Sequence, residues 1–371
     1  MKISILGSSI TDFGELWDKS LEDLFASAID GALQHAHLDS KDIEAVFVAN
    51  MAAGSLNHQR QLNALVAQHF PHYPPAMRLE AACASGGVAM LAAEYALLAG
   101  QFKTVLVVGA EKMTDVSSPE LTNILSSAAY SATEQGSTFP TLYALFAQHH
   151  MHKYGTTRRQ LSSVAVKNHL HALDNPHAQF HKKLTIEQVE ASAVVATPLH
   201  LLDCSPITDG AAAVILTTNA VSKKPTILGW GQGQDSLDLA GRDSLDELRA
   251  TRQAAEKAYT AAQLSAKDIQ VAEVHDCFTI AELFAIEDLG FVPKGQAGRA
   301  TENSLTTYGG QVVVNPSGGL KASGHPTGAT GVKQVAYLAQ LLEKQQYQYG
   351  LTHNVGGSGA TAVVHILGGT S

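Results

Sequence analysis

The chain has 371 residues, of which 45% are hydrophobic and 16% charged, and its net charge at pH 7 is -9. This length and composition allow large buried cores and two or three domain-sized units. A negative chain without runs of Lys and Arg is unsuited to binding the phosphate backbone of nucleic acids, so we expect no nucleic-acid partner. No stretch of 18 apolar residues is present, so we expect no membrane-spanning helix.

The N-terminus and the cysteines indicate a cytoplasmic protein. Residues 1–7 read as a short buried strand and lack the length and cleavage pattern of a signal peptide. Three cysteines, Cys83, Cys204 and Cys277, are too few for a disulfide framework. We therefore expect a reducing compartment.

Strand-like apolar runs alternate with helical patterns along the chain. The expected strands are 3–7, 45–50, 104–109, 211–217, 225–229, 271–275 and 360–367. The expected helices between them include 20–35, 87–98, 244–262 and 331–344. This alternation predicts an α/β fold with a parallel or mixed sheet covered by helices.

Three pairs of similar segments relate the first half of the chain to the second. They are ISILG at 3–7 with TILG at 226–229, LDSKDI at 38–43 with LSAKDI at 264–269, and DGAAAVIL at 209–216 with SGATAVVHIL at 358–367. The same order in both halves indicates a duplication. Residues 114–202 have no counterpart, and we expect this insert to contribute to binding.

Cys83 lies in the sequence EAACASGG, directly before a helical pattern. A cysteine at a strand-to-helix turn is close to free N–H groups and to the positive end of the helix dipole, and both favour a thiolate. The small neighbours leave room for a ligand. A buried structural cysteine is the alternative, and this motif alone leaves both interpretations open.

His325 lies in the loop NPSGGLKASGHPTG at 315–328, between glycines and prolines. Such a restrained loop suits an imidazole that faces a site, as a base for a thiol or as an oxyanion donor. A histidine that only caps the next helix is the alternative. The loop corresponds to the Cys83 turn in the repeat, so we expect each half to present one turn to a shared cleft.

Two further segments carry candidate groups. The sequence HDCF at 275–278 follows an expected strand, at the end where α/β proteins usually bind ligands. Residues 353–359 form an expected glycine-rich turn whose N–H groups suit an oxyanion. We expect no metal site, because Cys-x-x-Cys and His-x-x-x-His spacings are missing around His275. A dinucleotide fingerprint is also missing after the first strand.

Together these segments resemble the thiolase superfamily along essentially the whole chain. The similarity is closest to the sterol-carrier-protein type and to thiolase-domain acetyl-CoA acetyltransferases of archaea and bacteria. The motifs that carry it are AACASGG around Cys83, HDCF at 275–278, NPSGGLKASGHPTGATG at 315–331 and NVGGSGATAVV at 354–364.

The resemblance implies a five-layered αβαβα fold made of two duplicated halves and an inserted loop domain. Residues 1–113 and 203–222 would form the N-terminal half, 223–371 the C-terminal half, and 114–202 the loop domain. The resemblance also implies acyl-CoA and CoA as substrates, no separate cofactor, and a homodimer or tetramer.

The resemblance further implies a role for individual residues. Cys83 would be the nucleophile that accepts the acyl group as a thioester. His325 would activate this thiol and, with His275, form an oxyanion hole for the thioester oxygen. The backbone N–H groups of Cys83 and Gly356 would form a second hole, and Ser205 would contact the pantetheine arm.

The chain departs from many thiolases at Asn354, where those enzymes carry a second cysteine that moves the α-proton. The sterol-carrier-type members share the HDCF motif found here. We therefore expect Cys277, the cysteine of that motif, to act as the second catalytic thiol.

These expectations lead to a thiolase that makes or cleaves acetoacetyl-CoA or a longer 3-ketoacyl-CoA. One alternative is a ketoacyl-synthase-like condensing enzyme, which the Cys277 thiol and the Gly-His-Pro loop argue against. The other is an acyl-CoA-binding or scaffold subunit that is active only with partners. Archaeal-type relatives resemble components of complexes with 3-hydroxy-3-methylglutaryl-CoA synthase and a small OB-fold/zinc-ribbon protein.

Overall fold

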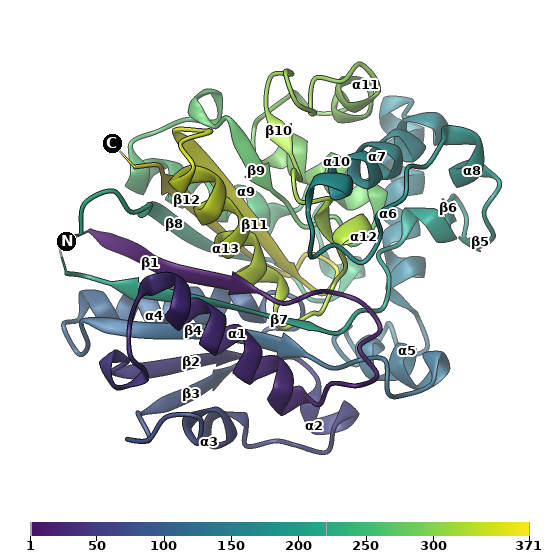
Figure 1. The fold of residues 1–371 in the computed structure, drawn as a ribbon. Coiled ribbons are helices and arrows are strands. Elements are labelled where there is room, and N and C mark those ends of the chain that lie inside the picture. Colours follow the sequence, from purple (N-terminus) through teal and green to yellow (C-terminus); the bar gives the residue numbers. More distant parts are fainter. Residues whose placement is uncertain (1, 220, 371) are drawn as a thin grey trace.

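The computed structural model describes residues 2–219 and 221–370 (Figure 1). Ten strands form a mixed sheet that consists of two five-stranded halves. The first half contains β1 (Ile3–Ile10), β2 (Ala45–Ala49), β3 (Ala76–Leu79), β4 (Thr104–Glu111) and β7 (Gly210–Thr217). The second contains β8 (Thr226–Gln234), β9 (Val271–Glu273), β10 (Val313–Val314), β11 (Tyr349–Gly356) and β12 (Thr361–Gly368).

The two halves of the sheet have the same topology. The strand order is β3-β2-β4-β7-β1 in the first and β10-β9-β11-β12-β8 in the second, so the strands correspond one to one in chain order. In each half the first two pairings of this order are parallel and the last two antiparallel. A short antiparallel pairing of Ile3 with Ile227 joins β1 to β8. The predicted duplication is confirmed by this topology.

Helices cover the outer faces of both halves and fill the space between them. On the first half lie α1 (Leu21–Ala36) and α3 (Leu62–Ala67), and on the second lies α9 (Arg249–Ala262) with α10 (Thr279–Asp288) beside it. The central layer consists of α4 (Ser85–Leu98) and α13 (Thr330–Glu343), which contact each other and strands of both halves. The result is the expected five-layered αβαβα arrangement.

The LDSKDI and LSAKDI segments form equivalent connections in the two halves. The helix before each segment ends in a left-handed residue, His37 after α1 and Gln263 after α9. A 3₁₀ turn follows in both, at Ser40–Asp42 and Ala266–Asp268, and each turn has a capping box. The repeated sequence thus specifies a repeated helix-to-strand turn, because caps and turns depend on local side chains.

The chain between β4 and β7 leaves the sheet and forms a segment whose first helix, α5, lies beside the first half and whose later helices lie beside the second (Figure 1). Its elements are α5 (Ser118–Ser126), α6 (Phe139–Tyr154), α7 (Arg158–His171), α8 (Ile186–Glu190), β5 (Val194–Ala196) and β6 (Leu199–His200). Helix α7 packs against α10, α11 (Ala297–Glu302) and α12 (Gly319–Ser323). This packing brings the segment next to the loop that contains His325.

Several sequence predictions are wrong in detail. The strands β3, β10 and β11 were not expected, and the glycine-rich turn expected at 353–359 is shorter. Residues 353–356 form the end of β11, and only 357–360 connect it to β12. Polar residues fit this buried strand because protein groups pair with both His353 and Asn354. The helix expected from residue 244 begins only at Arg249.

Within the described residues, no helix combines the length and the apolar character that crossing a membrane requires.

Candidate active site

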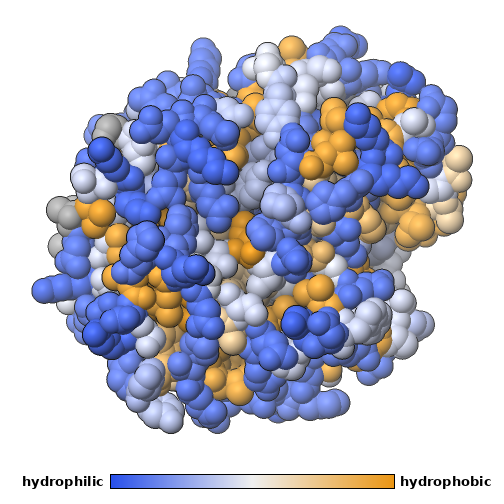
Figure 2. Space-filling view, in the orientation of Figure 1, coloured by the Kyte–Doolittle hydropathy of each residue, from blue (hydrophilic) through white to orange (hydrophobic). Residues whose placement is uncertain are grey.

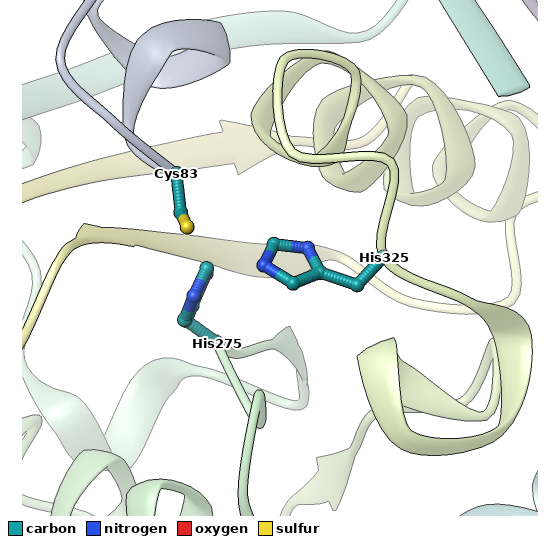
Figure 3. A group of neighbouring side chains, drawn as sticks. All are labelled: Cys83, His275 and His325. Carbon is teal, nitrogen blue, oxygen red and sulfur yellow. The ribbon is translucent and has the colours of Figure 1, made fainter. Parts of the chain in front are cut away.

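Three of the predicted side chains converge between the two halves of the fold (Figure 3). Cys83 precedes α4, His275 follows β9, and His325 lies in the loop before α13. The Cys83 sulfur and one ring nitrogen from each of the two histidines all lie within 4.8 Å of one another. Cys277 and Ser205 line the same cavity, which has a volume of about 340 Å³.

Glycines bring the two turns together. The N-termini of α4 and α13 meet in direct backbone contact: a Cβ on Gly86 would lie 2.8 Å from Gly331 Cα, and one on Gly331 would lie 2.4 Å from Gly87 N. No side chain larger than hydrogen fits at this crossing. Because Cys83 and His325 stand just before these N-termini, the crossing sets the distance between thiol and imidazole.

The Cys83 turn is held in a conformation that non-glycine residues rarely adopt. Ala82 has a φ of 52°, in the left-handed region. The Ser85 hydroxyl accepts a hydrogen bond from Ala81 N–H at 2.9 Å and donates one to the Ala82 carbonyl at 2.6 Å. Ser85 therefore fixes the turn from both sides and leaves the Cys83 side chain directed into the cavity.

The Cys83 thiol and the His325 imidazole are both neutral at physiological pH. Burial raises the pKa of Cys83 to about 12, with a further rise from Glu111 and Glu80, although the Gly357 N–H that faces the sulfur opposes it. Burial, together with Lys333, lowers the pKa of His325 to about 3. The pair is suited to proton transfer during attack on a substrate rather than to a resting ion pair.

Hydrogen bonds orient the His325 ring. Its Nδ1 lies 2.7 Å from the Thr330 hydroxyl oxygen, and the Thr330 hydroxyl donates its hydrogen to the Pro326 carbonyl at 3.1 Å. The Thr330 oxygen therefore accepts from Nδ1–H, which leaves a lone pair on Nε2. Figure 3 shows one ring nitrogen of His325 directed toward the other two side chains. The neutral ring can therefore act as a base through Nε2.

His275 lies edge-on to His325, with ring centroids 5.1 Å apart. Burial, followed by the neighbouring His325 and His353, lowers the pKa of His275 well below its usual value. Its Nε2 is buried and has no hydrogen-bond partner among the described residues. A buried ring nitrogen without a partner is costly unless a ligand pairs with it, as a developing oxyanion would.

The second thiol and a tyrosine share the cavity with Cys83. Burial raises the pKa of Cys277 well above its usual value, the nearby Cys83 adds to the rise, and the neighbouring Tyr143 hydroxyl opposes it. The Tyr143 hydroxyl donates its hydrogen to the Gly357 carbonyl at 3.1 Å, and its ring packs on Phe278 with centroids 4.7 Å apart. Tyr143 was not predicted, because nothing in the sequence distinguishes it from an ordinary core residue of α6.

Two buried carboxylates tie the turns of the site to each other. Glu111 accepts five hydrogen bonds of 2.9 Å from Asn50 Nδ2, Met51 N, Ala52 N, Thr327 Oγ1 and Gly328 N. Asp276 accepts from Leu320 N at 2.6 Å and Lys321 N at 3.2 Å. Glu111 thus links the first half to the His325 loop, and Asp276 links the HDCF turn to it. Their roles were not predicted, since their partners are distant in sequence.

Of the remaining predicted residues, Ser205 lines the same cavity, and Gly356 lies beside the Cys83 turn. Gly356 ends β11, and a Cβ there would lie 2.5 Å from the Ala81 carbonyl, so β11 and the Cys83 turn approach closely. Its N–H as an oxyanion donor stays a prediction. The Ser205 N–H donates to the Cys277 carbonyl at 2.9 Å, which fixes Ser205 beside the second thiol.

Comparisons with known proteins agree with the resemblance in the sequence. Residues 3–220 match the family model "Thiolase, N-terminal domain", and 231–369 match "Thiolase C-terminal domain-like". The chain is 45% identical to the acetyl-CoA acetyltransferase of Methanothermobacter thermautotrophicus, over 98% of this chain and 99% of that protein. It is 30% identical to sterol carrier protein 2 of Bos taurus, over 98% of this chain and 71% of that protein.

The fold is similar to a solved structure named Ltp2-ChsH2(DUF35) aldolase. The TM-score is 0.85 at 23% sequence identity, and the match covers 100% of this chain and 98% of the other.

Proposed function

Since the chain belongs to the thiolase family, we propose that it makes or cleaves acetoacetyl-CoA, or a longer 3-ketoacyl-CoA, through an acyl thioester on Cys83. The observation that carries this proposal is the convergence of a neutral thiol and two neutral imidazoles within 4.8 Å of one another, next to a cavity that Cys83, His325 and a second thiol, Cys277, line. The similarity to an acetyl-CoA acetyltransferase along nearly the whole chain supports the acyltransferase class. In this proposal CoA thioesters are the substrates, and no resident cofactor takes part.

In the cleavage direction, the reaction would begin with attack of the Cys83 sulfur on the 3-keto carbon of the substrate. The thiol proton would pass to His325 Nε2, and breaking the bond between C2 and C3 would leave an acyl-Cys83 thioester and the enolate of acetyl-CoA. His275 would donate a hydrogen bond to the enolate oxygen. Cys277 would transfer its proton to the enolate carbon, and acetyl-CoA would leave.

The second half of the reaction would restore both thiols. The Cys277 thiolate would take the proton of CoA–SH, and the CoA thiolate would attack the acyl-Cys83 thioester. Departure of the Cys83 thiolate would release the shortened acyl-CoA, and the proton held on His325 would return to Cys83. Every proton is accounted for by Cys83, Cys277, His325 and CoA, so the condensation direction can use the same groups in reverse.

The test compares Cys83→Ala and Cys277→Ala with the unchanged protein by intact mass and by turnover. Each protein is incubated with acetyl-CoA alone and with acetoacetyl-CoA plus CoA. We expect an acetyl adduct on the unchanged protein and on Cys277→Ala, none on Cys83→Ala, and turnover losses of at least about 10³-fold in both variants. No adduct from acetyl-CoA or longer acyl-CoAs would contradict the proposal and favour a binding or scaffold role. Turnover with malonyl thioesters would favour a condensing enzyme.

We also propose that two copies of the chain pair through the edge strand β3. This strand ends the first half of the sheet, and apolar side chains at this edge are exposed, with Met77 at 50% and Tyr73 at 67%. A partly apolar, unpaired edge is a template for pairing with another strand. Strand β3 directly precedes the Cys83 turn in the sequence, so an interface there would also hold the nucleophile in place.

A partner protein is a further part of the proposal. The name of the similar solved structure joins two components, Ltp2 and ChsH2(DUF35). In this chain, Val194 and Leu201 are 61% and 57% exposed, and Val195 between them in sequence lines the cavity that contains Cys83. Figure 2 shows apolar residues at the edge of the molecule where β5 and β6 lie. If the isolated protein forms the acetyl adduct but shows no turnover, this result would support dependence on a partner, such as a small OB-fold/zinc-ribbon protein.

A further inference from the structure

Asn354 connects three parts of the site. Its side chain, only 2% exposed, lies at the end of β11 beside the Cys83 turn. Its Oδ1 accepts a hydrogen bond from Gly87 N–H at 3.0 Å, and its Nδ2 donates to the Cys83 carbonyl at 2.9 Å. The same Nδ2 lies 3.3 Å from His275 Nδ1.

The two backbone partners fix which way the amide faces. An N–H group can only donate and a carbonyl can only accept, so exchanging the oxygen and nitrogen of Asn354 would break both bonds. One hydrogen of Nδ2 therefore points to the Cys83 carbonyl, and the other is available to His275. As a result, His275 Nδ1 must be the acceptor.

The opposite ring nitrogen of His275 must then carry the hydrogen. A neutral imidazole has one hydrogen, so acceptance at Nδ1 places it on Nε2. Nε2 is the buried nitrogen that has no partner among the described residues. The titratable groups that face the ring are His325 from the loop before α13, His353 from β11 and Cys83 from its turn. Burial and the two histidines lower the pKa of His275, so the ring is neutral at physiological pH.

We propose that Asn354 is a positioning residue that holds His275 in the tautomer with hydrogen on Nε2, so that this nitrogen donates to the substrate oxyanion. The donation to substrate rests on the proposed thiolase function, whereas the tautomer does not. An amide of this length offers two hydrogens and one acceptor. Aspartate offers only acceptors, and a hydroxyl or thiol offers one hydrogen, so neither can make all three contacts.

The first experiment needs no substrate. Nitrogen NMR of protein labelled with [15N]histidine distinguishes protonated from unprotonated ring nitrogens, and His275→Gln identifies the His275 signals. We expect an unprotonated Nδ1 and a protonated Nε2 in the unchanged protein. In Asn354→Asp, which keeps an acceptor for Gly87 N–H, we expect the hydrogen on Nδ1. A protonated Nδ1 in the unchanged protein would overturn the proposal.

The second experiment measures turnover of Asn354→Asp as a function of pH. At pH 8 we expect a loss of about 10²–10³-fold, the usual effect of removing one oxyanion donor. The new carboxylate raises the pKa of His275, and the imidazolium again carries hydrogen on Nε2. Activity of the variant should therefore recover as the pH falls and disappear as the pH rises through that pKa. The activity of the unchanged protein should not fall with the titration of His275 in this way.

Two comparisons keep this result interpretable. Asn57→Asp makes the same change at an amide that donates to the Lys112 carbonyl at 3.2 Å, and we expect its turnover to stay within threefold. A turnover of Asn354→Asp within threefold of the unchanged protein, with the same pH profile, would overturn the positioning role. If the unchanged protein has no thiolase activity, the proposed function fails, and the NMR result alone decides the tautomer.

Discussion

At the scale of single residues, burial sets the protonation of the site more strongly than charge. Burial is the largest cause of the raised pKa of Cys83 and of the lowered pKa values of His275 and His325. A buried neutral group avoids the desolvation cost of an ion. The consequence is a resting site without formal charge on the thiol or the imidazoles. Neighbouring groups such as the Thr330 hydroxyl decide where the hydrogens of the imidazoles lie.

This protonation state predicts how Cys83 reacts with iodoacetamide in the absence of substrate. The thiolate is the reactive form, and with a pKa of about 12 its fraction grows about tenfold per pH unit from pH 7 to 10. We expect the rate of Cys83 alkylation, followed by peptide mass spectrometry, to rise over this whole range. A free cysteine in a short peptide is the control, and its rate should level off above its own pKa near 8.5. A plateau for Cys83 below pH 9 would contradict the prediction.

At the scale of secondary structure elements, the crossing of α4 and α13 decides whether the site can form. The two helices hold corresponding places in the duplicated halves, and the turn before each one carries a catalytic candidate. Gly86 and Gly331 let the backbones touch, so the candidates reach one another from opposite halves of the fold. The duplication thus produces two different turns that meet, rather than two copies of one site.

We predict that Gly86→Ala destabilises the protein although alanine is the better helix former. The methyl group would lie within 3 Å of backbone atoms of α13, and such overpacking costs about 1–3 kcal/mol. Thermal unfolding should show a lower Tm, and turnover should fall because Cys83 and His325 are pushed apart.

The matched control is Gly14→Ala, where an added Cβ meets no atom within 4 Å. This variant should keep both its Tm and its turnover. A Tm for Gly86→Ala equal to or above that of the unchanged protein would show that the helices can separate without cost.

At the scale of the whole molecule, the edge strand β3 has a hydrogen-bonded neighbouring strand on one side only. The second half joins the first at β1 and β8, while β3 ends the first half with exposed side chains. Pairing of two β3 edges would continue the sheet across two copies and cover Met77 and Tyr73. This geometry supports the proposed homodimer.

We predict that Met77→Lys weakens the dimer, because a charge on an edge strand opposes pairing between edges. Light scattering coupled to size-exclusion chromatography should give a dimer mass for the unchanged protein and a monomer mass for the variant at low micromolar concentration. Leu305→Lys, at a residue 43% exposed elsewhere on the surface, should remain dimeric. A monomeric unchanged protein, or a dimeric Met77→Lys, would exclude this interface.

The amino-acid sequence alone determined the class of fold and most of the chemical groups of the site. Apolar periodicity and turn residues act locally, so they identified seven strands and four main helices, and three pairs of similar segments identified the duplication. Motifs with unusual local composition pointed to Cys83, His325 and the HDCF turn for the same reason. The turn predicted from the glycine-rich stretch is wrong at 353–356, because local composition does not reveal that a buried strand can satisfy its polar side chains.

Only the tertiary structure decided which groups complete the site. Tyr143 and Glu111 act through partners that are far away in sequence, so no local pattern distinguishes them from ordinary buried residues. Asn354 was noted only as a departure from the family motif, and its contacts with the Cys83 turn and His275 come from the fold. The neutral state of Cys83 and the direction of the His275 hydrogen likewise depend on burial and on neighbours from several elements. These properties arise when packing excludes water and pairs each donor with one acceptor. Neither condition can be deduced from the local sequence.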